Sequence, residues 1–483
     1  MIESQTEHDA LESTAVAHMS QVFEAQQEAF SLEPFPTLDV RLDRLVRLRK
    51  MVEQGSEIIV AAVSQDFGHR SPDESRIAEI AGTITAIDYA IARVRRWMRP
   101  SRRQATIWFL PASNQVIAQP LSVVGIMAPW NYPVNLALVP LVSALAAGNR
   151  VMIKMSELSP ATGQALANLA KQFFDVNELA VLGGEAKESA HFSSLPFGHL
   201  LFTGSSRVGR MVMSAAAQNL TPVTLELGGK CPAIVDGDYE LDEAAKRILW
   251  GKTFNAAQTC VAPDYVMVPK GQTAAFVEAM TRHYHANFPQ GALSDQYTSI
   301  VDERGHSRLT GLVDAAKRAG AEVRVCEPTT PEHNRRRKFP LTFVLNPNRD
   351  SALMQEEIFG PVLPVLEHDG LDDALRLVKQ GEHPLALYYF GHSSNQRESV
   401  LKKSLSGGVA FNDVMLQFLQ VDMAFGGVGA SGFGRYHGKE GFETFSHLKS
   451  VFTQRGMGRF TGLKLLYPPY GRLGRLVTSL MGG

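Results

Sequence analysis

Two side chains of this sequence have the chemistry of a nucleophile and a base, Cys260 and Glu226. Cys260 follows the segment FNAAQT (254–259) and is flanked by small and polar residues, although a cysteine in a large protein is more often a small buried apolar side chain. Glu226 lies between two leucines at the end of an apolar stretch, where an unpaired carboxylate is costly to bury. It therefore either pairs with Lys230 or has a raised pKa and serves as a general base.

A glycine turn and a proline-rich loop are two further candidates for the site. Residues 202–209 (FTGSSRVG) follow a predicted strand and open a helix, where free backbone N–H groups and the helix dipole attract phosphate. The turn matches neither GxGxxG nor a P-loop, so an ordinary strand-to-helix turn is the alternative. Residues 128–133 (APWNYP) form a rigid loop directly after another strand, where ligands bind in open α/β sheets. Asn131 in this loop either caps a turn or donates to a developing oxyanion.

The elements that must position these residues are alternating strands and helices. Crossovers of their length predict a parallel sheet with helices on its faces, which is a dinucleotide-binding architecture by pattern. The predicted strands of this sheet are 123–127, 151–154, 179–182, 199–203 and 223–227, with helices at 137–147, 160–174 and 206–219. A second α/β domain is predicted to begin near Glu226. Its strands are expected at 233–235, 265–268, 322–326, 343–345, 362–366 and 386–390.

The remaining segments have weaker patterns. Residues 41–61 and 73–98 are predicted to form two long helices. Residues 106–119 are predicted to form a hairpin that turns at 111–114. The tail from Gly456 onward is predicted to be irregular, and within it residues 463–480 carry two arginines among leucines. This stretch is expected to pack on a partner subunit rather than on a membrane.

Length and composition limit the class of protein. A chain of 483 residues predicts two or three domains, and 48 basic against 49 acidic residues give no basic excess for nucleic acid. Three cysteines, Cys231, Cys260 and Cys326, indicate a reducing compartment rather than a disulfide framework, and their spacing matches no zinc site. The polar N-terminus lacks the pattern of a signal peptide, and no apolar run reaches the roughly 18 residues that span a bilayer. We therefore expect a cytoplasmic protein without metal.

Taken together, the motifs resemble those of the aldehyde dehydrogenase superfamily, in the family's order along nearly the whole chain. The matching segments are PWNYP (129–133), KMSE (154–157), FTGSSRVG (202–209), ELGGK (226–230), QTC (258–260), EEIFGP (356–361) and FGGVGASG (425–432). VAPDY (261–265) and YHGK (436–439) are similar to the class 3 branch of this superfamily. LTPVT (220–224) and DFGHRS (66–71) are most similar to the bacterial coniferyl aldehyde type.

The resemblance implies an α/β fold with a Rossmann-like parallel-sheet cofactor domain, an α/β catalytic domain and a small β oligomerisation arm. The implied parts are 1–99 and 124–225 for NAD(P) binding, 226–411 for catalysis, 100–123 and 412–455 for oligomerisation and bridging, and 456–483 as a C-terminal extension. A homodimer is implied, with a tetramer as the alternative. Neither nucleic acid nor membrane is an expected partner.

The resemblance also implies a reaction, the NAD(P)-dependent oxidation of an aldehyde to its acid. Cys260 would attack the carbonyl, Asn131 and the Cys260 N–H would hold the oxyanion, and Glu226 would activate water to hydrolyse a thioester. Residues implied to hold the cofactor are Trp130, Lys154, Ser156, Glu157, Gly204, Ser205, Gly209, Leu227, Gly228, Glu357 and Phe359. Tyr132 and Gln417 are implied to contact the substrate.

The sequence departs from the family's pattern at three positions. Ala257 stands where the family usually has glycine, and its methyl group limits the backbone if the position requires a positive φ. Met155 replaces the usual proline, which should have a mild effect. Gln417 occupies a place where relatives often carry histidine, and this exchange is expected to alter the substrate mouth.

The predicted substrate is a hydrophobic aldehyde, because the loop 414–425 (VMLQFLQVDMAF) is mostly apolar. An aromatic aldehyde such as coniferyl aldehyde and a medium- or long-chain aliphatic aldehyde both fit this pattern. Three other interpretations stay open: a dehydrogenase that passes the thioester to coenzyme A, a non-catalytic cofactor-binding protein and a cysteine hydrolase. Glu226 argues against the first, because such relatives commonly lack this base. No histidine–asparagine partnering of the cysteine supports the third.

Overall fold

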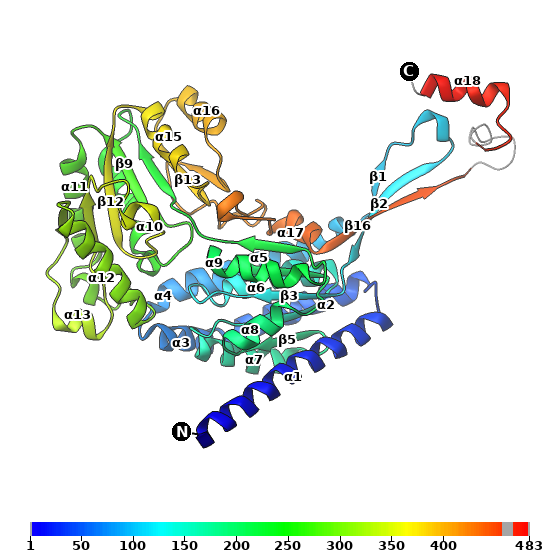
Figure 1. Ribbon diagram of the computed structural model, residues 1–483, viewed down its shortest axis with the longest axis horizontal. Helices are drawn as coiled ribbons and strands as arrows, with labels where there is room; N and C mark the ends of the chain where they lie inside the picture. The colour runs from blue at the N-terminus through cyan, green and yellow to red at the C-terminus, as the bar shows by residue number, and fades with distance from the viewer. Residues whose placement is uncertain (1, 456–466, 482–483) are drawn as a thin grey trace.

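One part of the protein is built on a six-stranded sheet with the order β15-β7-β6-β3-β4-β5, and all neighbours in it are parallel except β15 at the edge. A computed structural model describes residues 2–455 and 467–481 (Figure 1). All five strands predicted for this sheet are confirmed. The strands are β3 (Val123–Met127), β4 (Arg150–Lys154), β5 (Leu179–Leu182), β6 (His199–Thr203), β7 (Val223–Glu226) and β15 (Gly432–Phe433).

The helices around this sheet correct the prediction in three places. The predicted helix 41–61 is broken at Gly55, where a Cβ atom would lie 2.5 Å from Leu169 of α7, so that the close approach of α7 requires glycine. The predicted helix 73–98 contains a π-helical segment, η1. The N-terminal helix α1 was not predicted, because its apolar residues do not gather on one face of a helix. The helices are α1 (Ile2–Leu32), α2 (Leu38–Gln54), α3 (Ser56–Phe67), α4 (Pro72–Ser75), η1 (Arg76–Ala81), α5 (Gly82–Trp97), α6 (Asn135–Ala147), α7 (Pro160–Phe173), α8 (Ala186–Ser193) and α9 (Ser206–Ala217).

A second sheet has seven strands with the order β10-β11-β12-β9-β8-β13-β14, parallel except where β10 meets β11. Its strands are β8 (Pro232–Val235), β9 (Tyr265–Pro269), β10 (Glu322–Val325), β11 (Thr342–Leu345), β12 (Val362–His368), β13 (Ala386–Phe390) and β14 (Gly408–Phe411). The six predicted strands are confirmed, and β14 was missed. Its larger flanking helices are α10 (Leu241–Thr253), α11 (Thr273–Asn287), α12 (Glu303–Arg318), α15 (Leu371–Gln380) and α16 (Ser394–Lys403).

A three-stranded arm projects from the body of the protein (Figure 1). It consists of β1 (Ser101–Arg103), β2 (Ser113–Pro120) and β16 (Ser446–Thr453), with β2 in the middle. The predicted hairpin turn at 111–114 is wrong, because β1 pairs with β2 across the longer connection 104–112. The prediction of an irregular tail is wrong for α18 (Arg472–Met481), and residues 456–466 of that tail lie outside the described residues.

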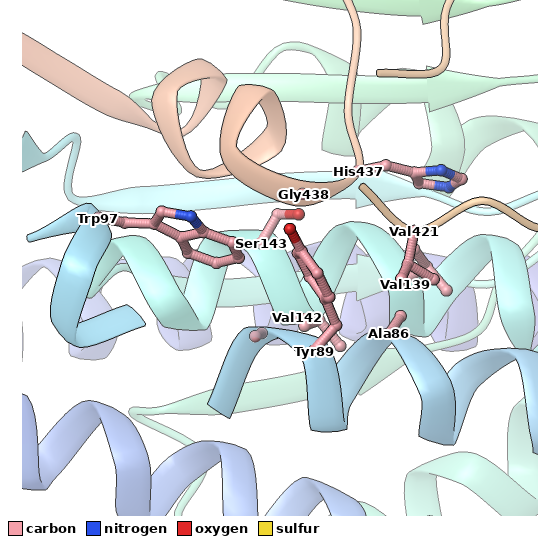
Figure 2. Close-up of a pocket in the computed structure, with 10 residues that line it drawn as sticks. Ala86, Tyr89, Trp97, Val139, Val142, Ser143, Val421, His437 and Gly438 are labelled. Carbon is pink, nitrogen blue, oxygen red and sulfur yellow. The ribbon is translucent and has the colours of Figure 1, made fainter. Parts of the chain in front are cut away.

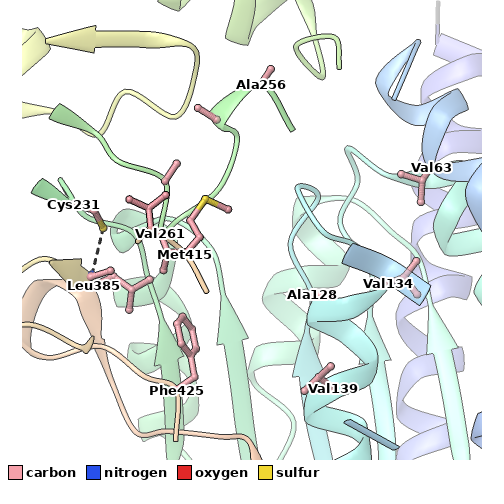
Figure 3. Packing of buried hydrophobic residues seen from close by; sticks show 14 of the residues in the cluster. Val63, Ala128, Val134, Val139, Cys231, Ala256, Val261, Leu385, Met415 and Phe425 are labelled. Atoms are coloured by element: carbon pink, nitrogen blue, oxygen red, sulfur yellow. Dashed lines mark hydrogen bonds between the residues drawn. The ribbon is translucent and has the colours of Figure 1, made fainter. Parts of the chain in front are cut away.

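The two sheets share one hydrophobic core (Figure 3). Val134 and Val139, at the start of α6, belong to the same buried cluster as Cys231, Val261 and Phe425 from the other side of the molecule. This continuous packing fixes the loops of both sheets relative to each other, which a site shared between them requires. Among the described residues, no helix is both long and apolar enough to cross a membrane.

Candidate active site

A cavity of about 630 Å³ opens at the carboxyl ends of the parallel strands β3, β4, β6 and β7. We call it the main cavity. It collects residues from both sheets, as expected for a ligand site in an α/β protein. The predicted site residues that line it are Trp130, Asn131, Lys154, Ser156, Glu157, Gly204, Ser205, Glu226, Leu227, Gly228, Cys260, Glu357 and Phe359.

The loop before Cys260 has an unusual backbone. Asn255, Ala256 and Ala257 have φ angles of 52°, 50° and 56°, and a left-handed conformation costs an ordinary residue about 1–2 kcal/mol. Position 257 therefore does require a positive φ, so the methyl group of Ala257 restricts the backbone where the family usually has glycine. Hydrogen bonds from outside the loop hold this conformation. Glu74 accepts from the Asn255 N–H at 3.1 Å, and the Asn255 side chain donates to the Asn131 carbonyl at 3.0 Å.

Cys260 is a neutral thiol in this state of the protein. Burial, with a smaller contribution from the nearby carboxylates of Glu357 and Glu226, raises the pKa of its thiol to about 12, while its own backbone N–H and that of Val261 act in the opposite direction. Its chemistry as a nucleophile therefore depends on removal of the thiol proton. The neighbouring Cys231 is fully buried, donates to the Cys260 carbonyl and accepts from the Ala386 N–H, so its role is structural.

Glu226 is a buried carboxylate, and neither of its oxygens has a hydrogen-bond partner among the residues that the structure describes. Burial raises the pKa of Glu226 well above its ordinary value. The alternative prediction, a salt bridge to Lys230, is wrong. Lys230 forms an ion pair with Asp264 and also donates to the carbonyls of Leu353 and Glu356, both at 2.9 Å. A buried, unpartnered carboxylate on a cavity is the arrangement expected of a general base.

Asn131 points its amide toward the cysteine loop. Its Nδ2 donates to the Gln258 carbonyl at 3.1 Å, two residues before Cys260. The Asn131 backbone carbonyl is held from behind by Arg70, at 3.0 Å. An amide N–H₂ beside a reactive thiol can donate to an oxyanion that forms there.

The other end of the main cavity is a slot between α8 and α9. Its walls are mostly small and apolar, which suits a flat base. They comprise Ala186, Ser189, Ala190 and Ser193 of α8, and Val208, Met211, Val212 and Ala215 of α9. These residues were missed in the sequence, because an apolar helix face normally indicates core packing. Next to the slot, the N-terminus of α9 with its cap Ser205 can bind phosphate. The donor set fits a dinucleotide.

Three further charged residues predicted from the sequence, Lys154, Glu157 and Glu357, line the main cavity. Lys154 donates to the carbonyls of Met155 and Gly184, and burial lowers the pKa of its ammonium group. Burial raises the pKa of Glu357 to about 8, and the charge of Asp264 contributes in the same direction. A Cβ atom at Gly228 would lie 2.0 Å from Glu357 Oε2, so the carboxylate reaches its place only over glycine. Glu157 also faces the cavity.

Three predicted site residues do not line the main cavity. Gly209 is buried in α9 and faces Leu227. The Tyr132 hydroxyl lies 2.6 Å from Thr259 Oγ1, next to Cys260, and Gln417 Nε2 donates to Tyr388 at 3.2 Å. The contacts of Tyr132 and Gln417 with substrate stay a prediction.

A second cavity lies between α5, α6 and the segment around His437 (Figure 2). Tyr89, Trp97, Ser143 and His437 line it, and its volume is only about 10 Å³. A space of this size holds at most one water molecule. It is therefore not a second substrate site.

Comparisons with known proteins bear on the family and the fold of the chain. The sequence model of the aldehyde dehydrogenase family matches residues 4–451 of this chain. A probable coniferyl aldehyde dehydrogenase of Pseudomonas aeruginosa is 47% identical over 457 residues, which cover 95% of this chain and 94% of that protein. A coniferyl aldehyde dehydrogenase of a Pseudomonas species is 42% identical over 436 residues, 90% of each protein. The substrate-bound structure of Staphylococcus aureus AldH is 33% identical, with a TM-score of 0.89 over 96% of this chain and 99% of its own.

Proposed function

The chain belongs to the aldehyde dehydrogenase family, whose members oxidise aldehydes with NAD(P), and from that premise we propose that Cys260 is the nucleophile of this reaction. One observation carries the proposal. Cys260, Glu226 and Asn131 come from three separate segments and meet on one cavity, whose other end is built for a dinucleotide. A nucleophile, a base and an oxyanion donor are the three groups that acyl chemistry requires.

The first half of the reaction forms a bond to sulfur. The Cys260 thiol gives its proton to solvent, and the resulting thiolate attacks the carbonyl carbon of the aldehyde, whose oxygen becomes an oxyanion. Asn131 Nδ2 and the Cys260 backbone N–H donate to this oxygen, a contribution of about 3 kcal/mol for each donor. NAD(P), which the residues of the main cavity around Ser205 and Glu357 would hold, would supply the hydride acceptor for the substrate carbon. A thioester on Cys260 remains.

The second half releases the acid. Glu226 accepts a proton from a water molecule that attacks the thioester carbon, and the C–S bond breaks with Cys260 as the leaving thiolate. The raised pKa of Glu226 makes it a stronger base than an exposed carboxylate, but only in the fraction of molecules in which it is charged. The product is the free carboxylic acid.

The cofactor end of the main cavity has its own assignments. Lys154 and Glu157 hold the adenosine ribose, Ser205 contacts the pyrophosphate, and Glu357 holds the nicotinamide ribose. Their shared position on one cavity, with Ser205 at the N-terminus of α9, supports these roles. Phe359 packs against Trp130, at 5.5 Å between ring centroids, and borders the nicotinamide position.

The substrate is a hydrophobic aldehyde, and an aromatic one such as coniferyl aldehyde fits best. Two similar proteins carry that substrate in their names. In the loop 414–425, Leu416, Leu419 and Met423 are exposed, so the chain presents apolar surface where a hydrophobic substrate would enter. Initial rates with aromatic and aliphatic aldehydes, each with NAD and NADP, test this assignment. A preference for short polar aldehydes would contradict it.

The assembly is a homodimer that forms through the arm, in a cytoplasmic compartment. Ile107, Leu110, Leu448 and Phe452 of the arm are exposed apolar side chains, which a partner subunit would cover. The three cysteines are unpaired, which agrees with a reducing compartment. Sedimentation equilibrium tests the dimer, and a monomer at micromolar concentration would contradict it.

The test of the nucleophile is Cys260→Ser. We expect kcat to fall by about 10⁴-fold or more, because the serine hydroxyl cannot replace the thiolate. Cys326→Ser, another cysteine that is not fully buried, serves as the control and should keep full activity. Mass spectrometry of the quenched wild-type reaction should find the acyl group on Cys260. An adduct elsewhere, or near-normal turnover of Cys260→Ser, would overturn the mechanism.

A further inference from the structure

Arg70 and Glu79 form an ion pair behind the main cavity, and both side chains are fully buried. Arg70 lies in the turn between α3 and α4, and Glu79 lies in η1. Arg70 NH1 donates to Glu79 Oε1 at 2.9 Å. Two other nitrogens of Arg70, Nε and NH2, have no hydrogen-bond partner among the described residues. A buried pair of this kind adds little stability by itself, so its role lies in what it holds.

Arg70 holds the backbone at Asn131. The same NH1 donates to the Asn131 carbonyl at 3.0 Å. The guanidinium group also lies over the ring of Tyr132, at 4.7 Å from its centroid, and over Phe67, at 5.2 Å. Arg70 therefore contacts the oxyanion donor and the next residue at once, through a hydrogen bond and a cation–π contact.

Glu79 holds the same loop at its other end. Its Oε2 accepts from the backbone N–H groups of Val134, at 3.2 Å, and Asn135, at 2.8 Å, where α6 begins. A carboxylate at a helix N-terminus is favourable, because it satisfies free N–H groups and the helix dipole. Arg70 and Glu79 together fix the chain from residue 131 to residue 135.

The cysteine loop is tied to the same segment of the chain. Glu74, five residues before Glu79, accepts from the Asn255 N–H and from the hydroxyl of Thr298, at 2.6 Å. Asn255 in turn donates to the Asn131 and Gln258 carbonyls. The short segment 70–79 thus holds both the loop 131–135 and the loop before Cys260. Part of this segment is π-helical, a conformation that often occurs at functional sites.

We propose that Arg70, fixed by Glu79, is the positioning residue that orients Asn131 toward the oxyanion. This inference rests on the proposed role of Asn131 as an oxyanion donor. Arg70 touches neither substrate nor cofactor in this arrangement, since it does not line the main cavity. Its effect passes through the Asn131 peptide.

The first test is Arg70→Lys. Lysine keeps the charge beside Glu79 but lacks the planar group that stacks on Tyr132 and reaches the Asn131 carbonyl. We expect kcat to fall by about 100-fold, the cost of a misplaced catalytic group, while KM for the aldehyde and Kd for NADH stay within about threefold. A loss confined to KM would overturn the proposal.

Arg41→Lys is the matched control. Arg41 is also fully buried, and it donates to the carbonyls of Ala146 and Ala147 at the opposite end of α6. We expect Arg41→Lys to lower the melting temperature but to change kcat by less than about twofold, because no group of the site depends on it. An equal loss of kcat in both variants would mean a general effect of buried arginines, against the proposal.

A double-mutant cycle with Asn131→Ala separates positioning from folding. If Arg70 acts through Asn131, adding Arg70→Lys to Asn131→Ala changes kcat by less than about threefold. If the full loss of about 100-fold appears again, Arg70 acts by another route and the inference is wrong. A wild-type kcat in Asn131→Ala alone would instead overturn the oxyanion role in the proposed function.

If Arg70→Lys does not fold, the variant Arg70→Met/Glu79→Gln replaces it. It removes both buried charges together, which proteins tolerate better than removal of one, and the introduced glutamine can still accept from the α6 N-terminus. We expect a folded protein whose Cys260 is alkylated by iodoacetamide at the wild-type rate, but whose kcat is about 100-fold lower. Normal kcat in this variant would overturn the proposal.

Discussion

The main cavity has two different ends. Its cofactor end is lined by backbone groups and small side chains, whereas its catalytic end contains buried polar groups and a strained loop. The cofactor end consists of the α9 N-terminus and an apolar slot between two helices. The catalytic end consists of a thiol with a pKa of about 12, a carboxylate without a partner among the described residues and a left-handed loop. The first end follows from ordinary helix and sheet geometry, whereas the second persists only because distant residues hold it.

The comparison predicts that changes of equal size will have unequal effects at the two ends. At the catalytic end, one polar atom carries one chemical role, so its removal should abolish a step. At the cofactor end, several contacts share the binding of one ligand, so the loss of one should weaken affinity by a modest factor. Changes to the loop conformation should affect stability more than rate.

The largest effect after loss of the thiol is expected for Glu226→Gln. The amide cannot accept a proton from water, so kcat should fall by about 10²–10⁴-fold and the acyl form of Cys260 should accumulate. Because the pKa of Glu226 is raised, the wild-type base is protonated at low pH, and kcat should rise with pH. This rise should be absent in Glu226→Gln.

Glu178→Gln is the control for this variant. Glu178 is a partly buried carboxylate just before β5, at the amino ends of the strands, where it pairs with Arg44 and Arg47. Its loss should leave the pH profile of kcat unchanged. A pH profile of Glu226→Gln with the wild-type shape would contradict the assignment of Glu226 as the base.

An intermediate effect is expected for Gly228→Ala. The added methyl group would displace Glu357, whose oxygen lies 2.0 Å from the Cβ position. We expect Kd for NADH to rise by about tenfold, or 1.4 kcal/mol, with a smaller change in kcat. Fluorescence titration of NADH measures this, with Gly311→Ala, which meets no atom within 4 Å, as the control. An unchanged Kd for NADH would contradict the assignment of Glu357 to cofactor binding.

The smallest effect is expected for Ala257→Gly. Glycine adopts a φ of 56° without the steric cost that alanine bears, and this gain exceeds the entropy that glycine loses on folding. We expect the free energy of unfolding to rise by about 0.5–1 kcal/mol, with kcat within about threefold. Chemical denaturation measures the change. A destabilised Ala257→Gly would mean that the loop is not strained.

The sequence predicted the strands of the two sheets better than it predicted the supports of the site. Strands β3 to β7 are apolar runs that end in motifs, so their order and the positions of Ser205 and Glu226 could be read locally. Glu79 carries no such signal, because a charged residue in a helical stretch normally indicates a solvated face, and the segment DFGHRS (66–71) gives Arg70 no role. Their burial depends on contacts 55 to 61 residues away in the chain, which no local pattern encodes.

The same reason explains the two alternatives for Glu226. Lys230 is near in sequence, and proximity along the chain favoured a salt bridge. In the folded protein Lys230 instead forms an ion pair with Asp264, which lies in a loop 34 residues further along the chain. The left-handed loop before Cys260 was predicted only in part. A positive φ was considered for Ala257, which departs from the family's glycine, but not for Asn255 or Ala256.

The short strand β15 bears on how the enzyme is made. Gly432 and Phe433 pair with Leu225 and Glu226, and the Ser431 carbonyl accepts from the Leu227 N–H at 3.1 Å. Strand β7, which carries Glu226, thus obtains its outer neighbour from a part of the chain synthesised about 200 residues later. On the ribosome, Glu226 therefore gains its flanking strand only near the end of translation.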